Sequence, residues 1–134
     1  MKPLYTLLTA IIAFIACNKE TATSETDVMN SMIANKNWYL DYSITANSTK
    51  SYVGQSTYFV TYLKDGTTRD SDGLNGTYKV EMNNHQSQIH VQVKTSNGNT
   101  MEVVYNIISV GYTKMVLSKQ ILTGTTAELY FTCK

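Results

Sequence analysis

Residues 88–107 read QIHVQVKTSNGNTMEVVYNI, and the class of fold follows from the order of these residues. Ile89, Val91 and Val93 alternate with polar side chains, which is typical of a strand with one buried face. Asn97 and Gly98 then form a strong hairpin signal, because glycine accepts a positive φ at no steric cost. Beyond this turn the alternating apolar residues are Met101, Val103, Tyr105 and Ile107. The stretch therefore predicts two antiparallel strands joined by a tight turn.

Strand-like segments continue on both sides of this hairpin, with turn signals at short and regular spacing. Besides the two arms of the hairpin, we expect strands at 38–45, 55–64, 67–70, 78–82, 114–118 and 127–133. No helical crossover separates them, so an antiparallel sandwich or barrel is indicated rather than a parallel sheet. Eight strands is also the number at which a closed barrel just holds its side chains or one small ligand.

A short helix is expected ahead of the strands. Thr26 can cap it, Asp27 suits its first turn, and apolar residues follow at helical spacing. Those apolar residues are Val28, Met29, Met32 and Ile33.

The N-terminus has the layout of a secretory signal. Lys2 precedes the apolar run Leu4–Ile15, which is too short for a bilayer span of about 20 residues. Ala16 and Cys17 then resemble the lipobox of bacterial lipoproteins. The resemblance implies that Cys17 is acylated, with palmitate among the chains, and becomes the first mature residue. The alternative is ordinary secretion, with Cys17 left as a plain thiol.

Three segments follow from this interpretation: a lipoprotein signal peptide at 1–16, the lipidated Cys17 with a flexible tether at 17–27, and one domain at 28–134. Removing 16 of the 134 residues leaves 118, a length that suits a single domain. The loss of Lys2 leaves 10 basic against 10 acidic residues, so the mature side chains sum to zero charge. The single arginine is Arg69. We therefore expect no nucleic-acid partner.

Several motifs, in their order along the chain, are similar to those of the small lipocalin-like lipoproteins of the Bacteroidetes group. They are NWYL at 37–40, YLKDGT at 62–67, GTYKV at 76–80, YNIIS at 105–109 and KMVLS at 114–118. The resemblance implies an all-β, eight-stranded antiparallel up-and-down lipocalin-like barrel. It also implies an interior ligand site and no catalytic set.

The sequence is rich in tyrosines, and the pattern allows two roles for those on inward faces. Tyr42, Tyr78 and Tyr105 fall on faces predicted to point inward, and Met115 would add an adaptable apolar lining. These side chains either line an amphipathic pocket for a small apolar ligand or plug the barrel as its core. A pocket of about 300 Å³ or more would favour ligand binding.

Catalytic and metal-binding patterns are weak. Glu81, Glu102 and Glu128 fall on predicted outward faces, and His85 and His90 would point to opposite sides of one strand. Cys133 lies on the apolar side of its strand, so a buried thiol is expected.

We expect no enzyme, no metal and no cofactor. Two function classes remain for a protein held by its N-terminal lipid in the cell envelope, in the outer membrane. The first is a binding module for a small apolar ligand. The second is a non-enzymatic interaction protein of an envelope assembly or of a secreted factor.

Overall fold

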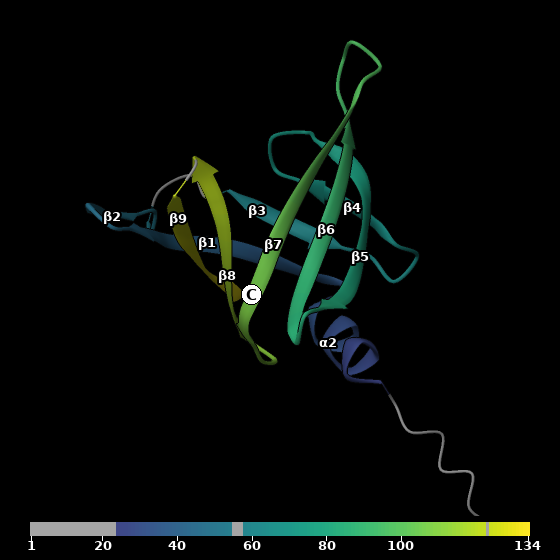
Figure 1. Ribbon diagram of the computed structural model, residues 1–134, viewed down its shortest axis with the longest axis horizontal. Helices are drawn as coiled ribbons and strands as arrows, with labels where there is room; N and C mark the ends of the chain where they lie inside the picture. The colour runs from purple at the N-terminus through teal and green to yellow at the C-terminus, as the bar shows by residue number, and fades with distance from the viewer. Residues whose placement is uncertain (1–23, 55–57, 123) are drawn as a thin grey trace, which may run out of the picture.

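The computed structural model describes residues 24–54, 58–122 and 124–134 (Figure 1). The signal peptide, Cys17 and the tether up to residue 23 lie outside the described residues. The described elements are α2 (Glu25–Ile33), β1 (Lys36–Thr45), β2 (Ser48–Ser51), β3 (Phe59–Tyr62), β4 (Thr67–Asp70), β5 (Asn75–Asn83), β6 (Gln86–Lys94), β7 (Thr100–Val110), β8 (Lys114–Leu122) and β9 (Thr125–Cys133).

Eight of these strands form a closed barrel. β1 and β3 to β9 pair with their neighbours in chain order, every pairing is antiparallel, and β9 pairs back onto β1. The predicted all-β, eight-stranded antiparallel up-and-down barrel with a short N-terminal helix is thus confirmed. Closure gives each barrel strand a paired neighbour on both sides, although β7 and β8 pair only through residues 106–110 and 115–118.

β2 is an additional strand that the sequence did not predict. It pairs with the second half of β1, from Tyr42↔Ser51 to Thr45↔Ser48, while β3 pairs with the first half. Its residues, Ser48–Ser51, are polar and exposed, so they carry no alternation that could reveal a strand. The predicted strand at 55–64 corresponds to β3, and its first three residues lie outside the described part of the chain.

A bulge in β1 reverses which side chains face inward. Leu40 pairs with a residue of β9, but the register shifts between Leu40 and Tyr42, so Asp41 is the extra residue. Beyond it the order of faces is inverted. Tyr42 pairs with Tyr130, which lies between two residues that line the interior, so both tyrosines face outward. Their rings stack with centroids 4.4 Å apart. The prediction that Tyr42 points inward is therefore wrong.

The helix begins earlier than expected. Ser24 is the N-cap, and its side chain accepts a hydrogen bond from the backbone N–H of Asp27 at 3.2 Å. Thr26 lies in the first turn instead of capping it, and residues 25–27 belong to the helix and not to the tether.

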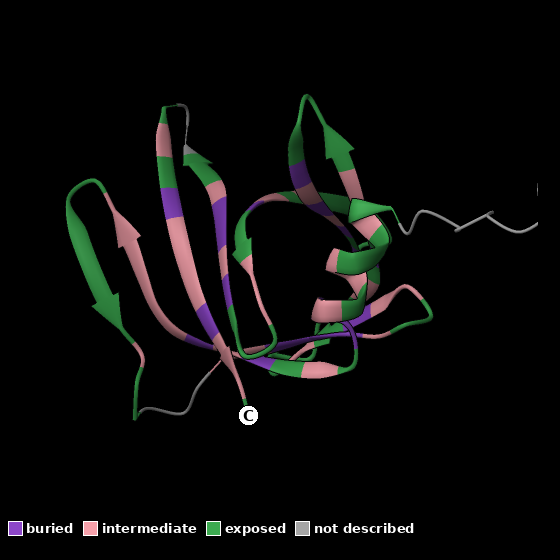
Figure 2. Cartoon of the chain, turned by 90° about the horizontal axis from the view of Figure 1, so that it is seen from below, coloured by how far each residue is buried: buried purple, intermediate pink, exposed green. Residues whose placement is uncertain are grey.

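The helix closes one end of the barrel, where it lies next to β5 and β7 (Figure 1). Trp38 Nε1 donates to the Ile33 carbonyl at 2.9 Å, and the Tyr78 hydroxyl donates to Asn30 Oδ1 at 2.9 Å. Figure 2, seen from below Figure 1, shows buried positions along the strands and exposed ones in the turns. The largest fully buried side chains of the described residues are Ile33, Trp38, Tyr62, Ile89, Met115 and Leu117. Tyr62 and Leu117 also border an interior cavity of the barrel, whereas the other four are packed in the core.

Position 76 in β5 requires glycine, because the backbone of the paired strand β6 packs closely against it. A Cβ at this position would lie 2.2 Å from the Gln92 carbonyl oxygen and 3.1 Å from its carbon. Both are backbone atoms of the paired strand, so they cannot swing aside as a flexible side chain can. We therefore expect Gly76→Ala to lower the free energy of unfolding by about 1–3 kcal/mol in denaturant titrations.

Gly111→Ala is the matched control, because the nearest atom to its added Cβ would be 3.9 Å away. Its effect should stay within about 0.5 kcal/mol. Equal stability of the two variants would contradict this explanation of Gly76.

Candidate functional site

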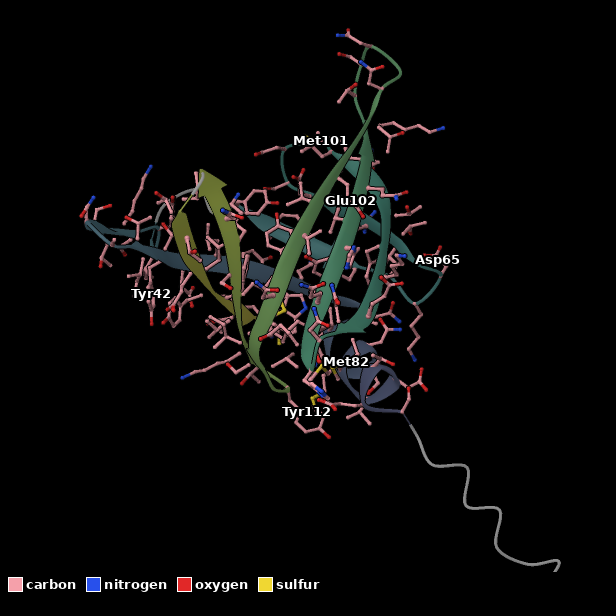
Figure 3. The ribbon with its side chains drawn as sticks, in the orientation of Figure 1. Tyr42, Asp65, Met82, Met101, Glu102 and Tyr112 are labelled. Atoms are coloured by element: carbon pink, nitrogen blue, oxygen red, sulfur yellow. The ribbon has the colours of Figure 1, made fainter. Side chains whose placement is uncertain are left out.

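The barrel holds a cavity of about 490 Å³ towards the end opposite α2. A set of apolar side chains from six strands forms much of its wall: Leu40, Val60, Val91, Val93, Val103, Leu117, Leu129 and Phe131. Leu74, Met101 and Ile121 are each about half exposed and form an apolar rim where the cavity opens. Met101 is labelled at this end in Figure 3. The volume falls within the range of about 300–1,000 Å³ that is usual for small-molecule sites.

Three tyrosine hydroxyls interrupt the apolar wall. Tyr58, Tyr62 and Tyr105 all line the cavity, and Tyr62 is only 2% exposed. Burial raises the pKa of each hydroxyl, and the negative charge of Asp70 raises the pKa of Tyr58 and of Tyr105 further. The three side chains therefore remain neutral and can donate hydrogen bonds throughout the physiological pH range.

Asp70 organises the loop at the mouth. Its Oδ1 accepts the backbone N–H of Asp72 and that of Leu74, each at 2.9 Å. The negative charge of the Asp70 carboxylate also acts on the Tyr58 hydroxyl, whose pKa it raises. The two hydrogen bonds fix the turn between β4 and β5, so the loop that carries Leu74 is held against the cavity.

Lys119 is a cationic side chain on the inner face of β8. Its neighbours on that face, Leu117 and Ile121, also line the cavity. The Lys119 ammonium lies 6.0 Å from the centroid of the Tyr105 ring, near the limit for a cation–π contact.

Only one of the four residues predicted as ligand-binding lines the cavity. Tyr105 does so, whereas Tyr42 lies on the outer surface. Tyr78 is buried with its ring edge-on to Tyr62, centroids 4.9 Å apart, and Met115 is fully buried in the core. Tyr78 and Met115 thus face inward as predicted, but they form the packed floor beside the helix. Cys17, the predicted lipid attachment, is outside the described residues.

The sequence contained weak signals for the residues that were missed. Tyr58 and Tyr62 alternate with Phe59 and Leu63, which are equally bulky, so the inward face could not be chosen. Phe59 faces outward, where it packs against Tyr39 with ring centroids 5.3 Å apart. Lys119 continues the alternation begun by the inward residues of β8, but the predicted strand ends at residue 118, so Lys119 falls outside it.

The outer face of β5 to β7 carries a cluster of polar side chains. His90 Nδ1 lies 3.2 Å from Glu102 Oε1, and His90 Nε2 lies 3.6 Å from Glu81 Oε2. Lys79 also pairs with Glu81 at 2.8 Å. His85 belongs instead to the turn between β5 and β6. In the described part of the chain, no three His, Cys, Asp or Glu residues are arranged to hold a metal ion.

The described residues include no helix that is long and apolar enough to span a bilayer. No protein-family model matches the chain, and no curated protein or solved structure matches it either. Function is therefore inferred from the residues and their geometry alone.

Proposed function

We propose that the protein is a non-enzymatic envelope lipoprotein whose barrel binds a small, largely apolar ligand. The observation that carries the proposal is the cavity of about 490 Å³, which exceeds the volume of about 300 Å³ that separates a pocket from a plugged barrel. Its apolar wall would hold the body of a ligand, and its tyrosine hydroxyls would orient a polar group. Anchoring through a lipid on Cys17, in the outer membrane, rests on the resemblance of Ala16 and Cys17 to a lipobox.

The second candidate is an interaction protein of an envelope assembly or of a secreted factor. It is supported by exposed apolar side chains near the α2 end, where Tyr112 is 76% and Met82 is 42% exposed (Figure 3). Ile108 of β7 is also about half exposed. We rank this role second, because it leaves the open cavity at the other end unexplained.

Tyr105 provides the test of ligand binding. A fluorescent probe with an apolar body should bind the native domain and gain fluorescence in the cavity. Tyr105→Trp adds bulk to the wall, so it should weaken probe binding about tenfold, which corresponds to about 1.4 kcal/mol. Tyr105→Ala should cost less than the roughly 3–5 kcal/mol typical of a fully packed aromatic, because this ring already borders open space.

Tyr112→Trp is the control, since Tyr112 is exposed and does not line the cavity. It should leave the dissociation constant of the probe unchanged. If the native domain binds no probe and Tyr105→Ala is severely destabilising, the carrier role fails. The interaction role would then replace it.

A further inference from the structure

Lys119 places a positive charge inside the barrel, below the rim. Leu117, one step deeper on the same face of β8, is 1% exposed, whereas Ile121, one step nearer the mouth, is 48% exposed. Lys119 itself is partly exposed, so its ammonium lies between the buried floor and the solvent. Arg69 also borders the cavity, but it is exposed and lies between the inward-facing Thr68 and Asp70, so its side chain points outside.

Among the described residues, no acidic side chain forms an ion pair with Lys119. No Asp or Glu oxygen of the described residues lies within 4.0 Å of its ammonium. Tyr105, next to it, presents a neutral hydroxyl and the face of its ring. A partly desolvated ammonium without a counter-ion is unfavourable, so an anionic group brought into the cavity would gain from pairing with it.

The two acids that line the cavity do not offer an equivalent site for a cation. Asp70 belongs to β4, which is four strands from β8 in either direction around the ring, so the two side chains lie on opposite walls. Asp70 already accepts hydrogen bonds from two backbone N–H groups. Asp72 lies in the exposed loop at the mouth.

We propose that the cavity selects an anionic amphiphile, an apolar body carrying one acid group, with the acid paired to Lys119 and hydrogen-bonded by the Tyr105 hydroxyl. This inference rests on the proposed ligand-binding function and adds the chemical class of the ligand. The apolar body fits below Lys119, where Leu40, Leu117 and Phe131 form the wall. The acid group then remains near the mouth, where it keeps part of its hydration.

The test uses two fluorescent probes with the same polyene hydrocarbon chain, a fatty acid and the corresponding alcohol. Because they differ only in the acid group, comparing them isolates the effect of the charge on binding. The acid should bind the native domain at least about tenfold more tightly than the alcohol at neutral pH and low salt. Lys119→Met keeps the length of the side chain but removes its charge, so the dissociation constant of the acid should rise to that of the alcohol. Binding of the alcohol should change less than twofold, and Lys119→Arg should retain the preference for the acid.

Lys94→Met is the matched control, because Lys94 ends β6 near the same mouth but is exposed and does not line this cavity. It should preserve the tenfold preference, and the melting temperature of each variant verifies folding. If the native domain binds acid and alcohol equally, or if Lys119→Met weakens both alike, anion selection is overturned while ligand binding stands. If neither probe binds the native domain, the proposed function is overturned as well.

Discussion

Replacing Trp38 with alanine is expected to lower the free energy of unfolding by about 3–5 kcal/mol. Trp38 is fully buried, and its Nε1 donates a hydrogen bond to the Ile33 carbonyl, the last residue of α2. The Lys36 ammonium lies 5.5 Å from the centroid of its ring. The substitution therefore removes a large packed side chain and the bond that ties the helix to β1. The free energy of unfolding of a whole domain is about 5–15 kcal/mol, so this expected loss is a large fraction of it.

Denaturant unfolding followed by circular dichroism would measure the loss. Trp38→Phe keeps an aromatic ring but leaves the Ile33 carbonyl without its donor, so its cost should be smaller, about 1–3 kcal/mol. Tyr112→Ala serves as the control for loss of an aromatic side chain, because Tyr112 is 76% exposed, and it should cost less than about 0.5 kcal/mol. A loss below about 1 kcal/mol for Trp38→Ala would mean that the ring contributes little to packing.

The strands that could be predicted from sequence are those with an undisturbed period of two. In β6 the predicted inward residues Ile89, Val91 and Val93 are all buried, and the predicted turn holds Gly98 at a φ of 78°. In β9 the inward residues Ala127 and Phe131 are buried as well. Here one face meets the core along the whole strand, so the residue pattern and the structure carry the same information.

At bulges, the alternation of residue types no longer shows which side chains face inward. The register shift at Asp41 moves Tyr42 outward and brings Ser43 to the cavity, although nothing in the residue types marks Asp41 as the extra residue. A second shift between Ile107 and Ser109 makes Ile108 the extra residue, so Val110 and not Ser109 packs against the core. A bulge depends on how two strands pair, and a single strand's sequence does not contain its partner's register.

The sequence also could not show whether the barrel interior is open or filled. The cavity exists because residues from most strands of the barrel leave space between them, and that space depends on barrel geometry as well as on side-chain size. Tyr62 and Tyr105 line it, while Tyr78 is used to hold Asn30 of the helix. Alternation predicted the same inward position for Tyr78 and Tyr105, but only Tyr105 lines the cavity, because the two lie at different heights in the barrel.

The position of α2 gives the proposed lipid anchor a geometric consequence. Ser24, the N-cap of α2, is seven residues after Cys17, and seven residues span at most about 25 Å even when fully extended. If Cys17 carries the lipid, the α2 end of the barrel must lie within that distance of the bilayer. The cavity opens at the opposite end of the barrel, farther from the point of lipid attachment than α2 is.

Cys17→Ser is therefore expected to release the protein from the membrane or to block its processing. Two or more acyl chains give stable anchoring, because each buried methylene contributes about 0.8 kcal/mol, and serine offers no thiol for their attachment. Membrane fractionation together with incorporation of labelled palmitate would measure the effect. Cys133→Ser is the matched control: Cys133 ends β9, its Sγ lies 3.2 Å from the Tyr112 carbonyl oxygen, and its loss should leave anchoring intact. If Cys17→Ser is processed normally and stays in the membrane fraction, ordinary secretion or another means of attachment replaces the lipoprotein interpretation, whereas the cavity and its ligand remain a separate question.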